Sequence, residues 1–124
     1  MPKVFDSSAV LALLYEEPGW EKIVPDLRGG LISAVNAAEV LAVLVRNEMP
    51  AAEALLALRK TGLEVVDFSL NTAAKTAGLL HRGISLGDRA CLATALLTQL
   101  PAVTADRNWA GLRVPDLRIE YIRP

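Results

Sequence analysis

The stretch that most constrains the fold is "RGISLGDRACLATALL", residues 82–97. It reads as a helix that is apolar on nearly every side for three turns, which is typical of a helix buried in a core. Its start nevertheless carries a carboxylate, Asp88, beside a guanidinium, Arg89. Asp88 follows Ser85 with the S-x-x-D spacing of a capping box, so it caps the helix, faces a functional site, or does both.

Short apolar strands and helices alternate on both sides of this stretch. We expect strands at residues 3–5, 31–34, 63–68, 102–105 and 118–122, and further helices at 7–17, 20–27, 36–48, 51–61 and 71–82. Asn71 is the expected N-cap of the last of these helices, and Gly83 is its expected stop. The alternation predicts a parallel sheet covered on both faces. Because no linker or repeat interrupts it, we expect one α/β domain over residues 1–124.

The composition narrows the class of protein. Hydrophobic residues make up 52% of the chain and charged residues 22%, which excludes a disordered chain. The net charge of −1 implies that any nucleic-acid contact is a local patch. A single cysteine, Cys91, and a single histidine argue against a disulfide and against a Cys/His zinc site. We find no signal peptide and no apolar run long enough to span a membrane, so a cytoplasmic protein is expected.

Four carboxylates occupy equivalent places in the predicted fold. Asp6 and Asp106 follow the first and fourth strands, while Glu39 and Asp88 lie in the first turns of helices. In parallel sheets the connecting loops converge at the carboxyl ends of the strands, which is where ligands bind. The topology therefore directs all four acids toward one edge of the sheet.

Capping is the alternative explanation for each acid taken alone. Asn36 and Glu39 have the N-x-x-E spacing of a capping box, and Asp6 and Asp106 could cap the helices that follow them. Capping does not, however, require four acids to share one edge, where they would repel each other. Oxygen ligands without nitrogen or sulfur suit a hard divalent cation such as Mg²⁺ or Mn²⁺. Such a cation can activate water for attack on a phosphate.

Four segments together resemble the PIN-domain ribonucleases, and more narrowly the VapC-type toxins of bacterial and archaeal toxin–antitoxin pairs. They are "VFDSSAVLALL" (4–14), "NAAEVLAVL" (36–44), "ISLGDRACLATALLTQLPAVTADRNW" (84–109) and "LRIEYI" (117–122). The resemblance covers essentially the whole chain, and the third segment is the most specific. It implies a PIN-like three-layer α/β/α fold with a central, mostly parallel five-stranded sheet.

The resemblance also implies an activity and its residues. It is that of a metal-dependent endoribonuclease that cleaves single-stranded or looped RNA with water activated by Mg²⁺ or Mn²⁺. The implied acidic pocket, which serves both catalysis and metal binding, consists of Asp6, Glu39, Asp88 and Asp106. Ser8 and Thr104 match small hydroxyl positions near the family's pocket, and we expect them to orient the acids. A cognate VapB-like antitoxin that blocks the pocket and a homodimer formed through apolar helices are implied as partners.

Several other side chains have both a functional and a structural interpretation. Arg89 and Arg107 each follow an acid directly, and Arg46 lies two helical turns beyond Glu39, so all three are candidate RNA contacts. Trp109 could stack on a base, but packing is the favoured interpretation. His81, at a helix end, is expected to be structural.

Other functions remain as alternatives. A haloacid-dehalogenase-like phosphatase needs a second aspartate two residues after the first, where this chain has Ser8. Serine-hydrolase spacings and glycine-rich nucleotide loops are absent from the sequence. An inactive PIN-like scaffold that binds RNA or protein, with its acids serving only as caps, is the non-enzymatic alternative. Stabilisation by Mg²⁺ or Mn²⁺ separates the nuclease from this scaffold.

Overall fold

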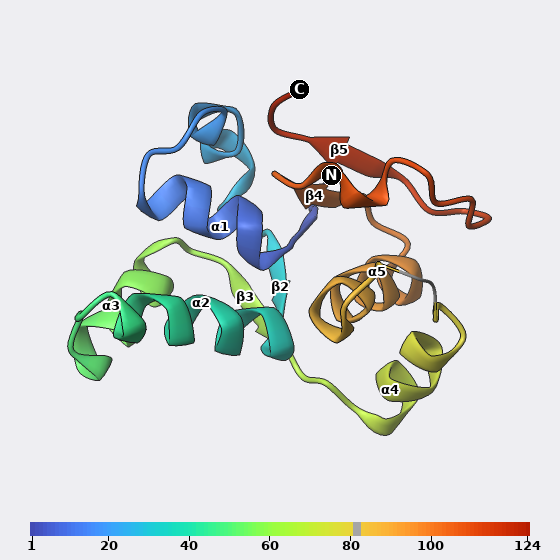
Figure 1. Cartoon of the computed structure of the whole chain (residues 1–124), viewed down its shortest axis with the longest axis horizontal. Coiled ribbons are helices and arrows are strands. Elements are labelled where there is room, and N and C mark those ends of the chain that lie inside the picture. Colours follow the sequence, from blue (N-terminus) through green and yellow to red (C-terminus); the bar gives the residue numbers. More distant parts are fainter. Residues whose placement is uncertain (81–82) are drawn as a thin grey trace.

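A computed structural model describes residues 1–80 and 83–124 of the chain. Strands and helices alternate along nearly its whole length, as the sequence predicts (Figure 1). The elements are β1 (Val4–Phe5), α1 (Ser7–Leu14), η1 (Trp20–Lys22), η2 (Val24–Asp26), β2 (Leu31–Ser33), α2 (Ala34–Arg46), α3 (Ala51–Lys60), β3 (Glu64–Val66), α4 (Leu70–Ala77), α5 (Leu86–Thr98), β4 (Ala102–Thr104), η3 (Arg107–Trp109) and β5 (Ile119–Tyr121).

The five strands form one sheet in the order β3-β2-β1-β4-β5, and every pair of neighbours is parallel. The resemblance implies a mostly parallel sheet, and the observed sheet is fully parallel. Val4 of β1 pairs with Leu31 on one side and with Ala102 on the other. Strands β2 and β4 lie on opposite sides of β1, and ligands of such sheets bind beside this point at the carboxyl ends of the strands. Asp6 follows β1 directly, and Asp106 lies two residues after β4.

Alternating residues of the strands point to opposite faces of the sheet and pack into two separate hydrophobic cores. Phe5, Ile32 and Val103 pack on one face with buried residues of α1, α2 and α3. Val4 and Ala102 pack on the opposite face with residues of α5. Figure 1 shows α1, α2 and α3 on one side of the strands and α4 and α5 on the other. The expected three-layer α/β/α arrangement is thereby confirmed.

Helix α5 contains most of the apolar stretch at residues 82–97. Ser85 is its N-cap, and Ser85 and Asp88 form both bonds of a capping box. Seven of its residues are buried, including Cys91, so it is the core helix that its composition predicts. It ends at Gln99, which adopts a left-handed conformation with φ of 58°. No helix of the described residues is long and apolar enough to cross a membrane.

Several predicted helix boundaries are wrong. Helix α1 ends at Leu14 instead of Glu17, and α2 ends at Arg46 instead of Glu48. Helix α2 begins at Ala34 because Ser33 caps it, and α4 begins at Leu70 because the Ser69 hydroxyl accepts the Thr72 N–H. Serine therefore takes the capping position that the sequence analysis gives to Asn71. Helix α4 ends at Ala77, well before Gly83, and residues 81 and 82 lie outside the described residues. The segment 20–27 forms two short 3-10 turns instead of a helix.

Candidate active site

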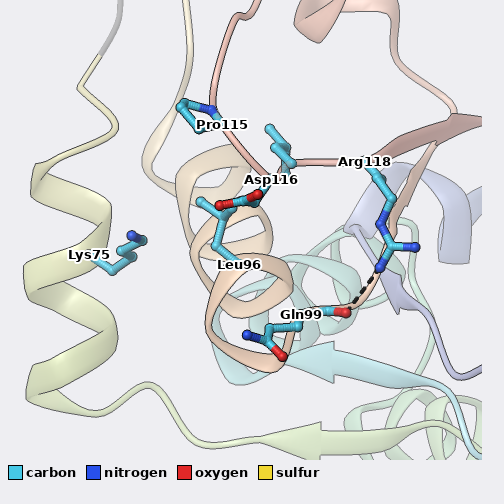
Figure 2. A pocket seen from close by; sticks show the side chains of 7 residues that line it. Lys75, Leu96, Gln99, Pro115, Asp116 and Arg118 are labelled. Atoms are coloured by element: carbon cyan, nitrogen blue, oxygen red, sulfur yellow. Dashed lines mark hydrogen bonds between the residues drawn. The ribbon is translucent and has the colours of Figure 1, made fainter.

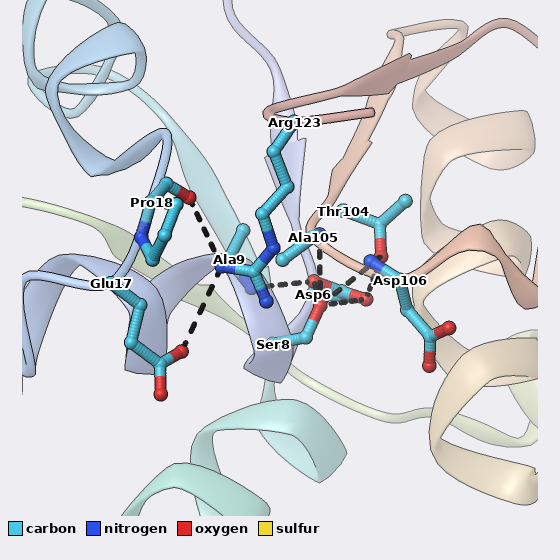
Figure 3. A network of polar contacts seen from close by, with 9 residues as sticks. All are labelled: Asp6, Ser8, Ala9, Glu17, Pro18, Thr104, Ala105, Asp106 and Arg123. Atoms are coloured by element: carbon cyan, nitrogen blue, oxygen red, sulfur yellow. Dashed lines mark hydrogen bonds and ion pairs between the residues drawn. The ribbon is translucent and has the colours of Figure 1, made fainter.

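Asp6 is the most deeply buried of the four acids and lies between β1 and α1. Its side chain caps α1 by accepting the Ala9 N–H at 2.9 Å. It also accepts hydrogen bonds from the Thr104 hydroxyl at 2.6 Å and from the Ser8 hydroxyl at 2.8 Å (Figure 3). The residue is only 3% exposed. Three donors from two elements thus fix one carboxylate at the carboxyl end of the sheet.

Burial dominates the acidity of Asp6. The pKa of its carboxyl group is raised from 3.8 to about 6, chiefly by desolvation and to a smaller extent by the nearby charge of Asp88. Hydrogen bonds from Thr104, Ala9 and Ser8 act in the opposite direction without cancelling the effect of burial. A carboxylate in this setting is ionised more easily when a cation lies beside it.

Ser8 and Thr104 connect the loops that follow β1 and β4. Their hydroxyl oxygens lie 3.1 Å apart, and both donate to Asp6. The Ala105 N–H donates to Ser8 Oγ, and the Asp106 N–H donates to Thr104 Oγ1, each at 3.0 Å. Backbone donors thus orient the two hydroxyls, and the hydroxyls orient Asp6. These contacts are the ones expected of residues that position the acid.

Glu39 reaches the same edge from α2 and is held by two donors from different helices. The Ser7 hydroxyl donates to Glu39 Oε1 at 3.0 Å, and the Asn36 amide donates to the same oxygen at 2.8 Å. The carboxylate lies against Gly87 of α5. Asn36 does not cap α2, because Ser33 does, so the predicted N-x-x-E capping box is wrong. Its amide instead binds the acid.

Asp88 is half-buried at the start of α5, where the Ser85 N–H donates to its carboxylate at 3.1 Å. Its relation to the other acids follows from Cys91, which lies one turn further along the helix. Desolvation raises the pKa of the buried Cys91 thiol, and the charges of Asp6, Asp88 and Glu39 each add to the increase. The charges of all three acids thus act on one buried thiol of α5, and Glu39 lies against Gly87, which directly precedes Asp88.

Asp106 lies two residues after β4 and is held by donors of the turn that it caps. It caps η3 by accepting the Asn108 backbone N–H, and it also accepts the Asn108 side-chain amide, both at 3.0 Å. Figure 3 shows its carboxylate directed away from Asp6. The backbone N–H of Asp106 donates to Thr104 Oγ1, and the same hydroxyl donates to Asp6, so Thr104 links the two acids.

The acids fit a hard cation by their chemistry. Within residues 1–80 and 83–124, none of the ion pairs includes any of the four. In the same residues no group of three or more Asp, Glu, His or Cys side chains is close enough to hold a metal ion by itself. Mg²⁺ usually keeps several of its waters and binds through one or two carboxylates, so it does not need a closed ligand cage. Asp6, Glu39 and Asp88 could hold such a hydrated ion.

The three candidate RNA-binding arginines have different surroundings. Arg89 is half-buried and donates to the Thr76 carbonyl of α4 at 3.3 Å, so its guanidinium joins two helices instead of facing a ligand. Arg107 is exposed and lies 4.0 Å from the centre of the Tyr121 ring. Arg46 is exposed in the last turn of α2. Arg107 and Arg46 keep guanidinium groups at the surface, and Arg89 does not.

The structure also decides whether Trp109 packs in the core or is free to stack on a base. Trp109 is 1% exposed and packs in the α5 core, which confirms the packing interpretation. His81 lies outside the described residues. Residues that the sequence analysis does not identify include Tyr121, which supports Arg107, and Arg123, which donates to the Pro18 carbonyl at 3.0 Å (Figure 3). Contacts between segments so distant in sequence leave no local signal.

Two cavities of similar size differ in their relation to the acids. A cavity of about 460 Å³ lies between α4, the last turn of α5 and the loop before β5, with Lys75, Gln99 and Arg118 in its lining (Figure 2). It is at the opposite end of α5 from Asp88. The second, of about 430 Å³, lies between α1, α2 and the C-terminal segment, and it includes Ser8. The second cavity therefore adjoins the acidic site.

Comparisons with solved structures show the same fold in three proteins. A toxin–antitoxin complex from Klebsiella pneumoniae matches with a TM-score of 0.75 and 20% identity, over 93% of this chain and 94% of the other. VapBC-1 from nontypeable Haemophilus influenzae matches with a TM-score of 0.73 and 16% identity, over 98% of both chains. DNA-bound VapBC from Salmonella typhimurium matches with a TM-score of 0.70 and 22% identity, again over 98% of both.

Comparison at the level of sequence families gives a more specific result. No curated protein matches the chain significantly. The family model of the PIN domain, however, matches residues 3–114, which include all four acids and every strand except β5. By this match over most of its length, the chain belongs to the PIN domain family.

Proposed function

We propose that this chain is a VapC-type toxin, an endoribonuclease that uses Mg²⁺ or Mn²⁺ to hydrolyse single-stranded or looped RNA. The observation that carries the proposal is that neutral donors hold Asp6 and Glu39, while no lysine or arginine of the described residues pairs with Asp6, Glu39 or Asp88. Membership in the PIN domain family supports a nuclease. The likeness of the fold to toxin–antitoxin proteins supports the toxin.

Each acid contributes through the way in which it is held. A bound divalent cation would supply charge neutralisation at the phosphate and acidify a water for in-line attack. Asp6 is presented by Ser8 and Thr104, so it does not have to reorganise when the cation arrives. Asp88 is fixed by the backbone of its own helix. No covalent intermediate is formed, because water attacks phosphorus directly. Asp106 contributes from the rim of the site.

Arg107 and Tyr121 are the groups best placed to hold the RNA. The guanidinium of Arg107 is exposed, lies over the Tyr121 ring and follows directly after Asp106. A guanidinium prearranged on an aromatic face binds phosphate with little loss of side-chain freedom. Arg46 offers a second cation on the helix that carries Glu39. Both would contact the RNA backbone on either side of the cleaved bond.

An antitoxin and a second copy of the chain are the proposed protein partners, in the cytoplasm. Three of the similar structures are named as VapBC proteins or a toxin–antitoxin complex. Apolar side chains that a partner could cover are exposed on α2 and α3, namely Val45, Leu55 and Leu56. The cavity beside Ser8 gives an antitoxin a place next to the acidic site.

A scaffold without catalytic activity is the second candidate, and one observation favours it. Asp6, Asp88 and Asp106 each make a capping hydrogen bond at the start of a helix or 3-10 turn. If capping were their whole function, neither Mg²⁺ nor Mn²⁺ would stabilise the protein.

The test is cleavage of a fluorogenic single-stranded RNA in EDTA, in Mg²⁺ and in Mn²⁺. We expect cleavage only with a metal, and we expect Asp6→Asn to abolish it. Glu120→Gln is the matched control, since Glu120 is a carboxylate paired with Lys3 away from the site. Cleavage by Asp6→Asn at the parental rate would refute the assignment. Absence of both cleavage and thermal stabilisation by the metals would favour the scaffold.

A further inference from the structure

Asn36 is a buried polar residue that has no capping function. It lies at the third position of α2 and is 1% exposed. Its amide nitrogen donates to Glu39 Oε1 at 2.8 Å and to the Gly87 carbonyl of α5 at 3.0 Å. Because both neighbours are acceptors, the amide can be oriented in only one way. One side chain therefore links an acid of α2 to the backbone of α5.

The cost of burying Asn36 indicates that these two bonds matter. Its Oδ1 atom is buried and has no hydrogen-bond partner among the described residues. A buried polar atom without a partner is destabilising, and asparagine is also a poor residue for a helix interior. An apolar residue of similar size would avoid both costs. Stability of the fold alone does not explain asparagine here.

Gly87 provides the other half of the contact. It is buried in the first turn of α5, where alanine would be the better helix former. A Cβ atom on Gly87 would lie 2.6 Å from both Cδ and Oε1 of Glu39, which is closer than real atoms approach. The Glu39 carboxylate thus occupies the space that any other residue at position 87 would fill with its side chain.

We propose that Asn36 and Gly87 form a socket that positions the Glu39 carboxylate beside Asp88. Asn36 binds the carboxylate from its own helix, and Gly87 leaves room for it on the neighbouring one. Gly87 directly precedes Asp88, so the socket sets the position of Glu39 relative to that acid. Both are positioning residues, and neither touches RNA. The inference rests on the proposed function, in which Glu39 and Asp88 serve one reaction.

The central variant is Gly87→Ala, which pushes the Glu39 carboxylate out of the socket. Gly111→Ala is the matched control, because a Cβ there meets no atom within 4 Å. We expect Gly87→Ala to lower kcat for RNA cleavage by about 10- to 100-fold, since small misplacements of reacting groups are costly. KM should change by less than about twofold, because the groups that would bind RNA are untouched. Gly111→Ala should match the parent in both constants.

A second readout does not depend on cleavage. The melting temperatures of the parent and of Gly87→Ala are compared in two backgrounds, one with Glu39 and one with Glu39→Ala. Without the Glu39 carboxylate, alanine at position 87 stabilises α5 through its higher helix propensity and clashes with no side chain at residue 39. We therefore expect Gly87→Ala to raise Tm by about 3 °C more in the Glu39→Ala background than in the parental one. Equal shifts in the two backgrounds would refute the socket.

Asn36→Leu replaces Gly87→Ala if the latter does not fold. It removes both amide bonds and the unpartnered oxygen while filling the same space. The socket predicts a drop in kcat of about tenfold or more, with KM and Tm close to those of the parent. Parental kcat in a folded Gly87→Ala or Asn36→Leu protein would overturn the proposal. If the parent itself cleaves no RNA, the proposed function fails, and the comparison of melting temperatures decides the socket alone.

Discussion

Acidic side chains at the two ends of the parallel sheet have different partners: a lysine at one end and neutral hydrogen-bond donors at the other. Just before the amino end of β1, Lys3 forms ion pairs with Asp26 at 3.0 Å and with Glu120 of β5 at 2.8 Å. At the carboxyl ends, Asp6 and the acids around it are held by hydroxyl and amide donors. In the described parts of the chain none of these acids forms an ion pair.

The difference separates charge that stabilises the fold from charge kept for a ligand. A lysine cancels the charge of its partners, whereas a neutral donor orients a carboxylate and leaves its charge in place. Burial raises the pKa of Asp6 to about 6, and no ion pair among the described residues lowers it again. The carboxyl end of a parallel sheet is also where ligands bind, beside the strand from which the chain extends the sheet in both directions. Lys3 thus neutralises the carboxylates at one end of the sheet, whereas the carboxylates at the other end keep their charge for a cation.

The largest effect is expected from Asp88→Asn, which removes one charge at the carboxyl end. Cleavage of RNA should fall by at least about 100-fold, because the cation that would neutralise the phosphate would lose one of its carboxylate partners. Asparagine can still accept the Ser85 N–H, so the melting temperature should stay close to that of the parent. Asp26→Asn makes the same change at the amino end and should leave cleavage unaltered. A parental rate for Asp88→Asn in an initial-rate assay would contradict the comparison.

The next effect concerns the pH dependence of stability that Asp6 produces. Its carboxyl group has a pKa of about 6 in the folded chain against 3.8 when exposed, so the folded chain binds the proton more tightly. The free energy of unfolding should therefore fall by up to about 3 kcal/mol between about pH 4 and pH 6, and then stay constant.

Urea unfolding in EDTA across this pH range measures the effect. Asp6→Asn should lose this fall in stability, and Asp106→Asn, which keeps Asp6, should retain it. If the parent and Asp6→Asn had parallel pH profiles, Asp6 would not carry the proton.

A smaller effect is expected from Thr104→Val, which removes the 2.6 Å hydrogen bond to Asp6. The lost donor should raise the pKa of Asp6 and lower the free energy of unfolding at pH 7 by about 1–2 kcal/mol. The matched control is Thr94→Val, since the Thr94 hydroxyl donates within α5 to the Ala90 carbonyl at 2.8 Å. NMR titration of the Asp6 carboxyl carbon should show a shifted midpoint in Thr104→Val only. An unshifted midpoint would show that Thr104 does not tune Asp6.

The smallest effect is expected at the amino end, from Lys3→Met. The three partners are partly exposed, so stability should fall by only about 0.5–1 kcal/mol, and by less at high salt. Cleavage should be unaffected. Unfolding at two salt concentrations, together with the RNA assay, checks both statements. A loss of cleavage as large as that of Asp88→Asn would remove the distinction between the two ends.

The layout of the sheet and the place of Asp6 after its first strand could be predicted from the sequence. Alternating strands and helices fix a parallel topology, and that topology carries Asp6 and Asp88 to one edge whatever their side-chain partners are. Asp88 combines both interpretations offered for it, because it completes a capping box and its charge raises the pKa of the Asp6 carboxyl group. Local spacing and topology agree at this residue.

Contacts between helices could not be predicted in the same way. The spacing of Asn36 and Glu39 fits a capping box, but Ser33 already caps α2, and the amide turns toward Gly87, 51 residues away. Arg89 follows an acid as Arg107 does, yet it binds the Thr76 carbonyl because α4 packs against α5. Spacing along the chain carries no information about such partners.

The most direct test of a cation site at the carboxyl end is a titration with Mn²⁺ followed by electron paramagnetic resonance, without RNA. The parent and Lys3→Met should bind Mn²⁺ saturably and equally, whereas Asp6→Asn should bind it at least about tenfold more weakly. Equal binding by the parent and Asp6→Asn, or no saturable binding by the parent, would contradict the claim that these carboxylates are kept for a cation.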